Sequence, residues 1–259
     1  MQLAFRRARG FSLAEIAIVM VIVGLLIGGL LAPLAAQMDQ RDFSDTQKRI
    51  EYANELLLGF AIANGRLPCP ASSTSNGDES PAGGGTCTNN YDGYLPAKAL
   101  GMQPTDTSGY ALDAFNNRIR YALSKIVTPA GTCTGSPPFS SSTNLKANGL
   151  QCLPADLLVC SGSQASGFTR TSCGTSNSLV NANTVVAIVF SAGKTSAASD
   201  AARTDELANT DGLQTDSSAT FVYHTPTPSG ATGGEFDDQM VWISAGLLYG
   251  RMVSAGILP

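Results

Sequence analysis

The chain has 259 residues, of which 14% are charged and 43% hydrophobic, and its formal net charge is −4. Such a length can bury a sizeable core in one large domain or two small ones. The charged fraction is well below the typical value of about 25%, which argues against a cytosolic helical protein, and the mild acidity argues against a basic nucleic-acid-binding body. No short period runs through the sequence, so collagen, coiled-coil and low-complexity classes are excluded.

The first distinctive segment is an uncharged, mostly apolar run at residues 16–36. About 20 apolar residues in a helix cross a hydrocarbon core of roughly 30 Å, so the run predicts a membrane span. Arg6, Arg7 and Arg9 precede it, which predicts a cytoplasmic N-terminus with the remainder of the chain outside the cytoplasm. A cleaved secretory signal, with its shorter apolar stretch, and a plain signal anchor are alternative interpretations.

Glu15 stands at the start of this run, and neither alternative accounts for it. A carboxylate among lipid-facing side chains is costly, which makes such a residue a functional candidate by default. The plainer interpretation is that Glu15 sits at the membrane edge and reaches water.

The string RGFSLAE at residues 9–15, followed by the long apolar run, resembles the N-terminal signal of type IV pilins and type II secretion pseudopilins. The family pattern is Gly followed by Phe-Thr-Leu-Ile-Glu and a long apolar stretch. The Gly, Phe, Leu and Glu of the pattern match, whereas Ser12 replaces the usual Thr and Ala14 replaces a larger aliphatic residue.

The resemblance implies that another enzyme processes this chain. A prepilin peptidase would cut between Gly10 and Phe11, releasing a leader at residues 1–10, and would then N-methylate Phe11. Glu15 would pair with the new α-amino group of Phe11, in the same subunit or a neighbour, which offsets the desolvation of both charges. The implied partners are prepilin peptidase, other pilin or pseudopilin subunits and inner-membrane lipid. The implied location is the bacterial inner membrane, with a periplasmic head, and then a filament or the cell surface.

One long helix is expected to continue past the apolar run. Its half at residues 11–37 would serve the membrane and assembly, and its half at residues 38–64 is amphipathic. The pair Asn64-Gly65 predicts the helix end, with the glycine in the left-handed cap conformation. The apolar positions of the second half share one face: Phe43, Ile50, Leu57 and Ala61, with Ala53 and Phe60 beside them.

Residues 65–259 are expected to form a globular head, because this part is rich in Ser, Thr, Gly, Asn and Pro and contains short apolar strands. The pattern predicts an α+β fold, with an antiparallel β-sheet and helices on one side of it. The resemblance implies that this fold is pilin-like, with the long N-terminal helix packed on the head. The expected strands are a half-buried one at 118–124, a fully buried one at 185–190 and two more at 221–224 and 240–244. A terminal helix at 247–255 is expected to bury Leu247, Leu248, Met252 and Val253.

All six cysteines lie in the head, and none shows the C-x-x-C spacing of a zinc ribbon or a redox motif. An even number of cysteines in an exported domain predicts disulfides, and six cysteines allow 15 pairings. We favour sequential pairs that would each staple a Ser- and Gly-rich loop, and free buried thiols are the alternative. The favoured pairs are Cys69–Cys87, Cys133–Cys152 and Cys160–Cys173.

Little in the head points to catalysis. His224 is the only histidine, which excludes a multi-histidine metal site, and no Gly-x-Ser-x-Gly nucleophile context or Walker-type loop is present. We therefore expect no enzyme. Basic residues are scattered through the head, so no nucleic acid is favoured as a partner.

Carboxylates gather in two late segments of the head. Calcium takes six to eight oxygen ligands, which such segments can supply, although the spacing is not that of an EF-hand. The resemblance adds weight, because some pseudopilins bind calcium in a late loop. Asp205, Glu206 and Asp211 are the expected ligands of a structural calcium ion, and a solvated acidic loop is the alternative. The carboxylates concerned are Asp200, Asp205, Glu206, Asp211 and Asp216, then Glu235, Asp237 and Asp238.

Three functional interpretations remain at this stage. The first is a structural subunit, a minor pilin or pseudopilin, of a type IV pilus or a type II secretion filament. The second is a pilin-anchored head that serves as an adhesin or a DNA-uptake receptor. The third is an ordinary single-span periplasmic protein. Processing at Phe11 separates the third interpretation from the first two.

Overall fold

The structure is a computed structural model of the chain, which forms two compact units, residues 1–43 and 44–259. The division falls inside the first helix, and the boundaries expected at residues 10, 37 and 64 stay a prediction. The residues described are 12–129, 131–133, 138–175, 178–181, 183–195, 202–210 and 218–258, without the side chains of 29–33 and 35.

The first helix, α1, runs from Leu13 to Asn64 and ends where the sequence predicts. Gly65 follows it with a φ of 68°, and its N–H donates to the carbonyl oxygen of Ala61 at 2.8 Å. Glycine adopts this left-handed conformation without steric cost, which is why it ends helices so often. The expected helix end is confirmed.

The membrane span expected at residues 11–37 is not supported by the described part of the chain. No helix there is both long and apolar enough to cross a membrane. Residue 11 and the side chains of 29–33 and 35, which belong to the expected span, lie outside the described residues.

The second unit is built around a four-stranded antiparallel sheet in the order β1-β2-β8-β10. This confirms the expected combination of an N-terminal helix and an antiparallel sheet. Phe190 of the central strand β8 pairs with Arg120 of β2 on one side and with Met240 of β10 on the other. The strands are β1 (Gly93–Tyr94), β2 (Arg120–Leu123), β8 (Val185–Ser191) and β10 (Gln239–Ser244).

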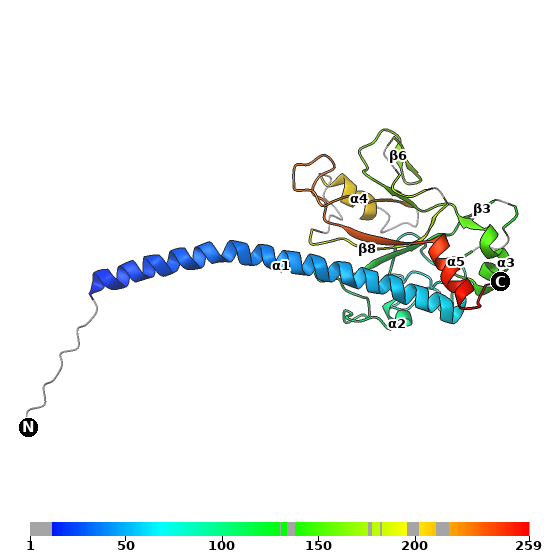
Figure 1. Ribbon diagram of the computed structural model, residues 1–259, viewed down its shortest axis with the longest axis horizontal. Helices are drawn as coiled ribbons and strands as arrows, with labels where there is room; N and C mark the ends of the chain where they lie inside the picture. Colours follow the sequence, from blue (N-terminus) through cyan, green and yellow to red (C-terminus); the bar gives the residue numbers. More distant parts are fainter. Residues whose placement is uncertain are drawn as a thin grey trace, which may run out of the picture. The chain divides into compact units, whose positions relative to one another are not determined.

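Both faces of this sheet are covered. On β8, Ala187 and Val189 join one hydrophobic cluster, and Ile188 and Phe190 join another. Within the second unit, α1 and α4 lie on opposite sides of β8 (Figure 1), so the expectation of helices on only one side of the sheet is wrong. The first cluster includes Ile50, Ala53, Leu57 and Ala61 of α1 with Leu248 and Met252 of α5, and the second includes Leu157, Val159, Ala219 and Phe221.

The remaining elements are short and surround the sheet. The strand expected at 221–224 in the antiparallel sheet corresponds to β9, which lies outside that sheet and pairs in parallel with β5, so this part of the prediction is wrong. The helices are α2 (Ala97–Leu100), α3 (Ser142–Asn148), the 3-10 turn Gly149–Gln151, α4 (Thr204–Thr210) and α5 (Ala245–Ser254). The other strands are β3 (Val127–Thr128), β4 (Leu153–Pro154), β5 (Leu158–Cys160), β6 (Phe168–Thr169), β7 (Ser172–Cys173) and β9 (Thr220–Val222).

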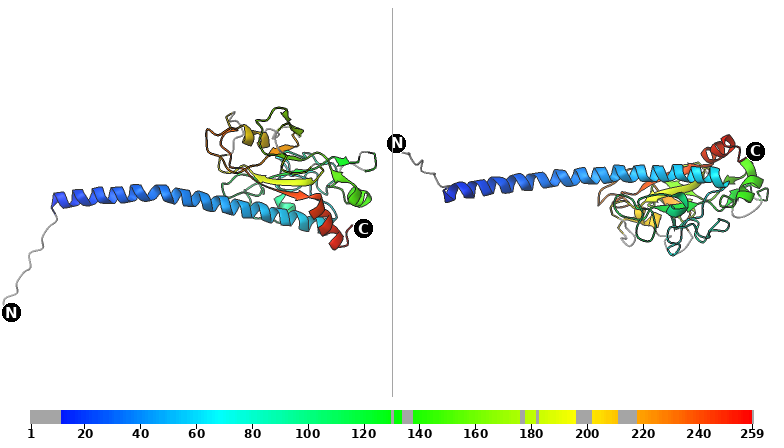
Figure 2. Two further views of the ribbon diagram at one scale, coloured as in Figure 1. Left: turned by 45° about the horizontal axis from the view of Figure 1, so that its top comes forward. Right: turned by 90° about the horizontal axis from the view of Figure 1, so that it is seen from below.

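Two burial predictions were wrong. Strand β2 was expected to be half-buried but is buried throughout, because α1 and α5 cover one face of the sheet and a second apolar layer covers the other. The terminal helix buries Leu248 and Met252 as expected, but Leu247 and Val253 are 39% and 42% exposed. Both views in Figure 2 place α5 beside the C-terminal end of α1, and this placement decides which side of α5 is buried.

Three disulfides cross-link the head, and they are the sequential pairs favoured from the sequence. All six cysteines take part, so the alternative of free buried thiols is wrong. The pairs are Cys69–Cys87, Cys133–Cys152 and Cys160–Cys173.

A largely buried ion pair, Arg66–Glu79, holds the loop that Cys69–Cys87 closes. Glu79 accepts two hydrogen bonds from Arg66, at 2.7 and 2.8 Å, and further ones from the N–H groups of Cys69 and Gly83. Burial by itself raises the pKa of Glu79. The hydrogen bonds and the charge of Arg66, with the two N–H donors, outweigh burial, so the pKa lies below its ordinary value.

We expect Glu79→Gln to lower the free energy of unfolding by about 1–3 kcal/mol at pH 7, because it breaks a largely buried pair. A lowered folded-state pKa gives stability that is present above the ordinary pKa of 4.5 and is lost as the pH falls through the folded-state value. The difference between wild type and variant should therefore shrink in acid. Urea unfolding at pH 7 and at a pH near 3 measures it.

Asp78→Asn is the matched control, since Asp78 forms an exposed ion pair with Lys98 at 3.4 Å. Surface pairs contribute little, so this change should stay within about 0.5 kcal/mol at either pH. An equal loss for Glu79→Gln at both pH values would contradict the role given to the ionised carboxylate.

Candidate functional site

The start of α1 carries the first candidate site. Glu15 Oε2 accepts the N–H of Ser12 at 2.8 Å, and Ser12 Oγ accepts the N–H of Glu15 at 3.3 Å. This reciprocal pair is a capping box, whose Ser-x-x-Glu spacing was available in the sequence. Gly10 and Phe11 lie outside the described residues, so the pairing of Glu15 with the amine of Phe11 stays a prediction.

The second candidate site lies in the head, around the first turn of α4. Asp205 and Glu206 belong to this turn and are only 4% and 0% exposed. The alternative of a solvated acidic loop is therefore wrong for these two residues. Asp211, the third expected calcium ligand, lies outside the described residues.

Asp205 has both carboxylate oxygens engaged by other segments. Its Oδ1 accepts the N–H and the hydroxyl of Ser163 at 2.6 and 2.5 Å, and its Oδ2 lies 3.2 Å from Nε2 of His224. The ring of His224 stacks on Phe236, with centroids 4.0 Å apart. Asp205 therefore links α4 to the segments that carry Ser163 and His224, and its carboxylate does not lie in one group with that of Glu206.

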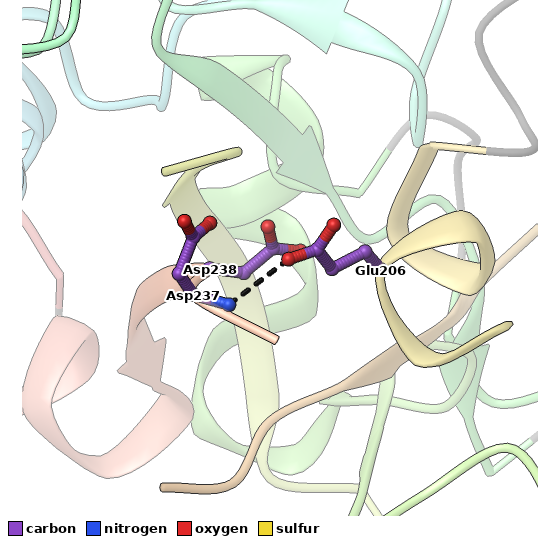
Figure 3. Close-up of side chains that lie close together, drawn as sticks. All are labelled: Glu206, Asp237 and Asp238. Carbon is purple, nitrogen blue, oxygen red and sulfur yellow. Dashed lines mark hydrogen bonds between the residues drawn. The ribbon is translucent and has the colours of Figure 1, made fainter. Parts of the chain in front are cut away.

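Glu206 is grouped instead with Asp237 and Asp238, the two residues just before β10. One carboxylate oxygen of each residue lies within 4.8 Å of those of the other two. Figure 3 shows the carboxylates of Glu206 and Asp238 next to each other, and the N–H of Asp237 donates to Glu206 Oε1 at 3.0 Å. The three residues bring α4 and the entry of β10 together.

Each of these carboxylates has one oxygen held by the protein. Glu206 Oε1 accepts the N–H of Asp237, and Asp238 Oδ2 accepts the side-chain amide of Asn209 at 2.6 Å. Asp237 Oδ2 accepts the N–H and hydroxyl of Thr195, at 3.1 and 2.8 Å. Within the part of the chain that the structure describes, the second oxygen of each is buried without a hydrogen-bond partner: Glu206 Oε2, Asp237 Oδ1 and Asp238 Oδ1. Glu206 Oε2 lies 3.6 Å from Nη1 of Arg203, with which it forms an ion pair.

Burial and mutual repulsion make these groups resist ionisation. Burial, with the charges of Asp237 and Glu235, raises the pKa of Glu206 to about 7. Burial also raises the pKa of Asp237, and it raises that of Asp238 well above its ordinary value, with help from the charges of Glu206 and Asp237. Two buried carboxyl groups and a half-buried one repel each other when all are ionised, so retained protons or a nearby positive charge such as that of Arg203 stabilise the group.

The sequence predicted an acidic site in this part of the head, but it did not predict which carboxylates lie together. Asp237 and Asp238 were noted as acidic, and Glu206 was an expected ligand. The grouping depends on α4 packing near the entry of β10, across 31 residues of chain. The signal that was available is an Asp-Asp pair directly before an apolar strand, where buried carboxylates need partners.

The N-terminus defines a class of protein. Residues 5–31 match the family model of the prokaryotic N-terminal methylation motif. This motif is the signal of type IV pilins and pseudopilins, and it supports a pilin- or pseudopilin-like protein. Comparisons with curated proteins and with solved structures find no match, so the pilin-like fold of the head stays a prediction.

Proposed function

We propose that the chain is a minor structural subunit of a type IV pilus or type II secretion filament. In this proposal, prepilin peptidase removes residues 1–10 and methylates Phe11, and the mature chain passes from the inner membrane into the filament. The observation that carries the proposal is the methylation motif at residues 5–31.

The surface of α1 in the first unit supports an assembly role. Large apolar side chains are exposed all around the helix rather than along one stripe, as they are on a helix that is covered on all sides. Exposed apolar surface of this extent marks a site of interaction with protein or lipid. Leu13 is 88% exposed, Met20 69%, Val21 63% and Leu25 73%. Copies of the same helix in a filament, and lipid before assembly, are the proposed cover.

A processing assay tests the proposal. Co-expression of the full chain with a prepilin peptidase should shorten it by the ten residues of the leader, and Gly10→Val should prevent this, because the added side chain obstructs close approach of the backbone to the protease. Gly24→Val is the matched control, since the space around Gly24 is open, and it should be processed normally. Cleavage of both variants, or of neither the wild type nor the control, would refute processing after Gly10.

A further inference from the structure

We propose that a pocket lined by residues of β1, β2 and the last turn of α4 binds the carboxylate of a small hydroxylated acid, such as a uronic acid. The pocket has a volume of about 320 Å³ and lies wholly within the unit formed by residues 44–259. The inference is independent of the filament role. The polar residues that line the pocket are Tyr94, Asn116, Asn117, Arg118, Arg120 and Thr210.

The charge of the lining is the first argument. Two guanidinium groups, those of Arg118 and Arg120, line the pocket, and no carboxylate is among the lining residues that the structure describes. The whole chain has a formal net charge of −4, so a cationic pocket is not a simple consequence of its composition. A concave site with two fixed positive charges attracts an anion.

Both arginines have donors left for a ligand. Nε and Nη2 of Arg118 lie 2.7 Å from Oδ2 of Asp106, and Arg120 donates from Nε and Nη2 to Gly93 and Asp92. A guanidinium has five N–H donors, so neither arginine uses all of them in these contacts. Burial lowers the pKa of Arg120 although the charge of Asp92 raises it. Asp92 alone therefore does not balance the cost of burying this guanidinium.

Stacked aromatic rings hold the two guanidinium groups in place. Tyr94 and Tyr110 pack edge to face, with ring centroids 5.1 Å apart. Cζ of Arg118 lies 4.1 Å from the ring centroid of Tyr110, and Cζ of Arg120 lies 4.8 Å from that of Tyr94. Side chains that are already fixed lose little conformational entropy when a ligand binds. The planar fork of arginine also matches the two oxygens of a carboxylate.

The neutral lining groups select a ligand with hydroxyl groups. Nδ2 of Asn117 donates to the carbonyl oxygen of Gly193 at 2.5 Å, which leaves the carboxamide oxygen as an acceptor. The hydroxyl of Thr210 donates to the carbonyl oxygen of Glu206 at 3.2 Å, so its oxygen can also accept. Ligand hydroxyls can donate to such acceptors, whereas inorganic phosphate at neutral pH offers mainly acceptors itself.

The size of the pocket limits the ligand further. Its volume of about 320 Å³ is at the lower end of the range of roughly 300–1,000 Å³ for small-molecule sites. A single sugar ring with a carboxylate fits this volume better than a folded peptide or an oligosaccharide would.

A ligand-observed NMR titration of the full chain in detergent at pH 7 tests the inference. The wild type should bind D-galacturonate with a dissociation constant of about 1 mM, the order expected for a ligand of this size. D-galactose lacks the carboxylate and should bind at least about tenfold more weakly, because it forms no charge-assisted hydrogen bonds with the arginines. Inorganic phosphate should also bind more weakly than galacturonate.

Two variants and a matched control locate the site. Arg118→Gln should weaken galacturonate binding by about tenfold or more. Asn116→Gly removes a carboxamide while glycine accepts the φ of 67° at this position, and it should weaken binding by about threefold. Arg251→Gln makes the same change as the first variant in an exposed ion pair with Glu55, outside the pocket, and should bind like the wild type.

Absence of galacturonate binding by the wild type, or equal binding of galactose, would overturn the inference. Tighter binding of phosphate than of galacturonate would overturn the assignment of a hydroxylated carboxylate. Should Arg118→Gln not fold, Asn116→Gly and the selectivity of the wild type decide the matter, and an unchanged affinity in Asn116→Gly would count against this pocket.

Discussion

Glu15→Ala is expected to leave cleavage of the leader intact and to lower incorporation of the protein into filaments by about tenfold or more. The reason is the charge pair proposed between the Glu15 carboxylate and the α-amino group of Phe11. Removing the carboxylate leaves the amine of Phe11 unpaired where the proposed filament would bury it, which disfavours assembly. Sheared filaments probed with an antibody to the head measure the incorporated fraction.

Two controls keep this result interpretable. Ser12→Ala removes only the hydroxyl of the capping box and should reduce incorporation far less, since the carboxylate remains. Glu51→Ala deletes a second, exposed carboxylate from the same helix and should behave like the wild type. Normal incorporation of Glu15→Ala would refute the assembly role of this residue.

Leu57→Ala is expected to destabilise the head by about 2–5 kcal/mol. Leu57 is 0% exposed and lies in the cluster that joins the second half of α1 to the sheet. The substitution removes apolar contact and leaves a cavity between two rigid elements that cannot both move to fill it. Urea unfolding followed by circular dichroism gives the change in the free energy of unfolding.

Tyr52→Ala provides the comparison on the same helix, because Tyr52 is 53% exposed, and its effect should stay within about 0.5 kcal/mol. A loss below about 1 kcal/mol for Leu57→Ala would mean that α1 does not share a cooperative core with the sheet.

Short sequence patterns predicted those features of the fold that depend on residues close together in the chain. The end of α1 follows from Asn64-Gly65, where glycine supplies the left-handed conformation. The buried face of its second half follows from apolar residues at helical spacing, and Ile50 and Leu57 are indeed buried. The strand at 185–190 was recognisable because an unbroken β-branched run suits a strand that is covered on both faces.

Features that depend on distant packing could not be predicted in this way. The exposure of Leu247 depends on where α5 lies against α1. The grouping of Glu206 with Asp237 and Asp238 requires α4 to pack near β10, which no local spacing encodes. The sequence predicted that Asp205 and Glu206 bind the same calcium ion. In the structure these adjacent residues of α4 have different partners: Asp205 accepts a hydrogen bond from Ser163, and Glu206 accepts one from the N–H of Asp237.

The N-terminus of the mature protein tests the central claim most directly. Intact-mass and N-terminal fragment measurements on protein purified from membranes and filaments should show a chain that begins at Phe11 and carries one methyl group on its amine. A chain that still begins at Met1, or one cleaved on the C-terminal side of the apolar run, would contradict the assignment of a pilin-type subunit.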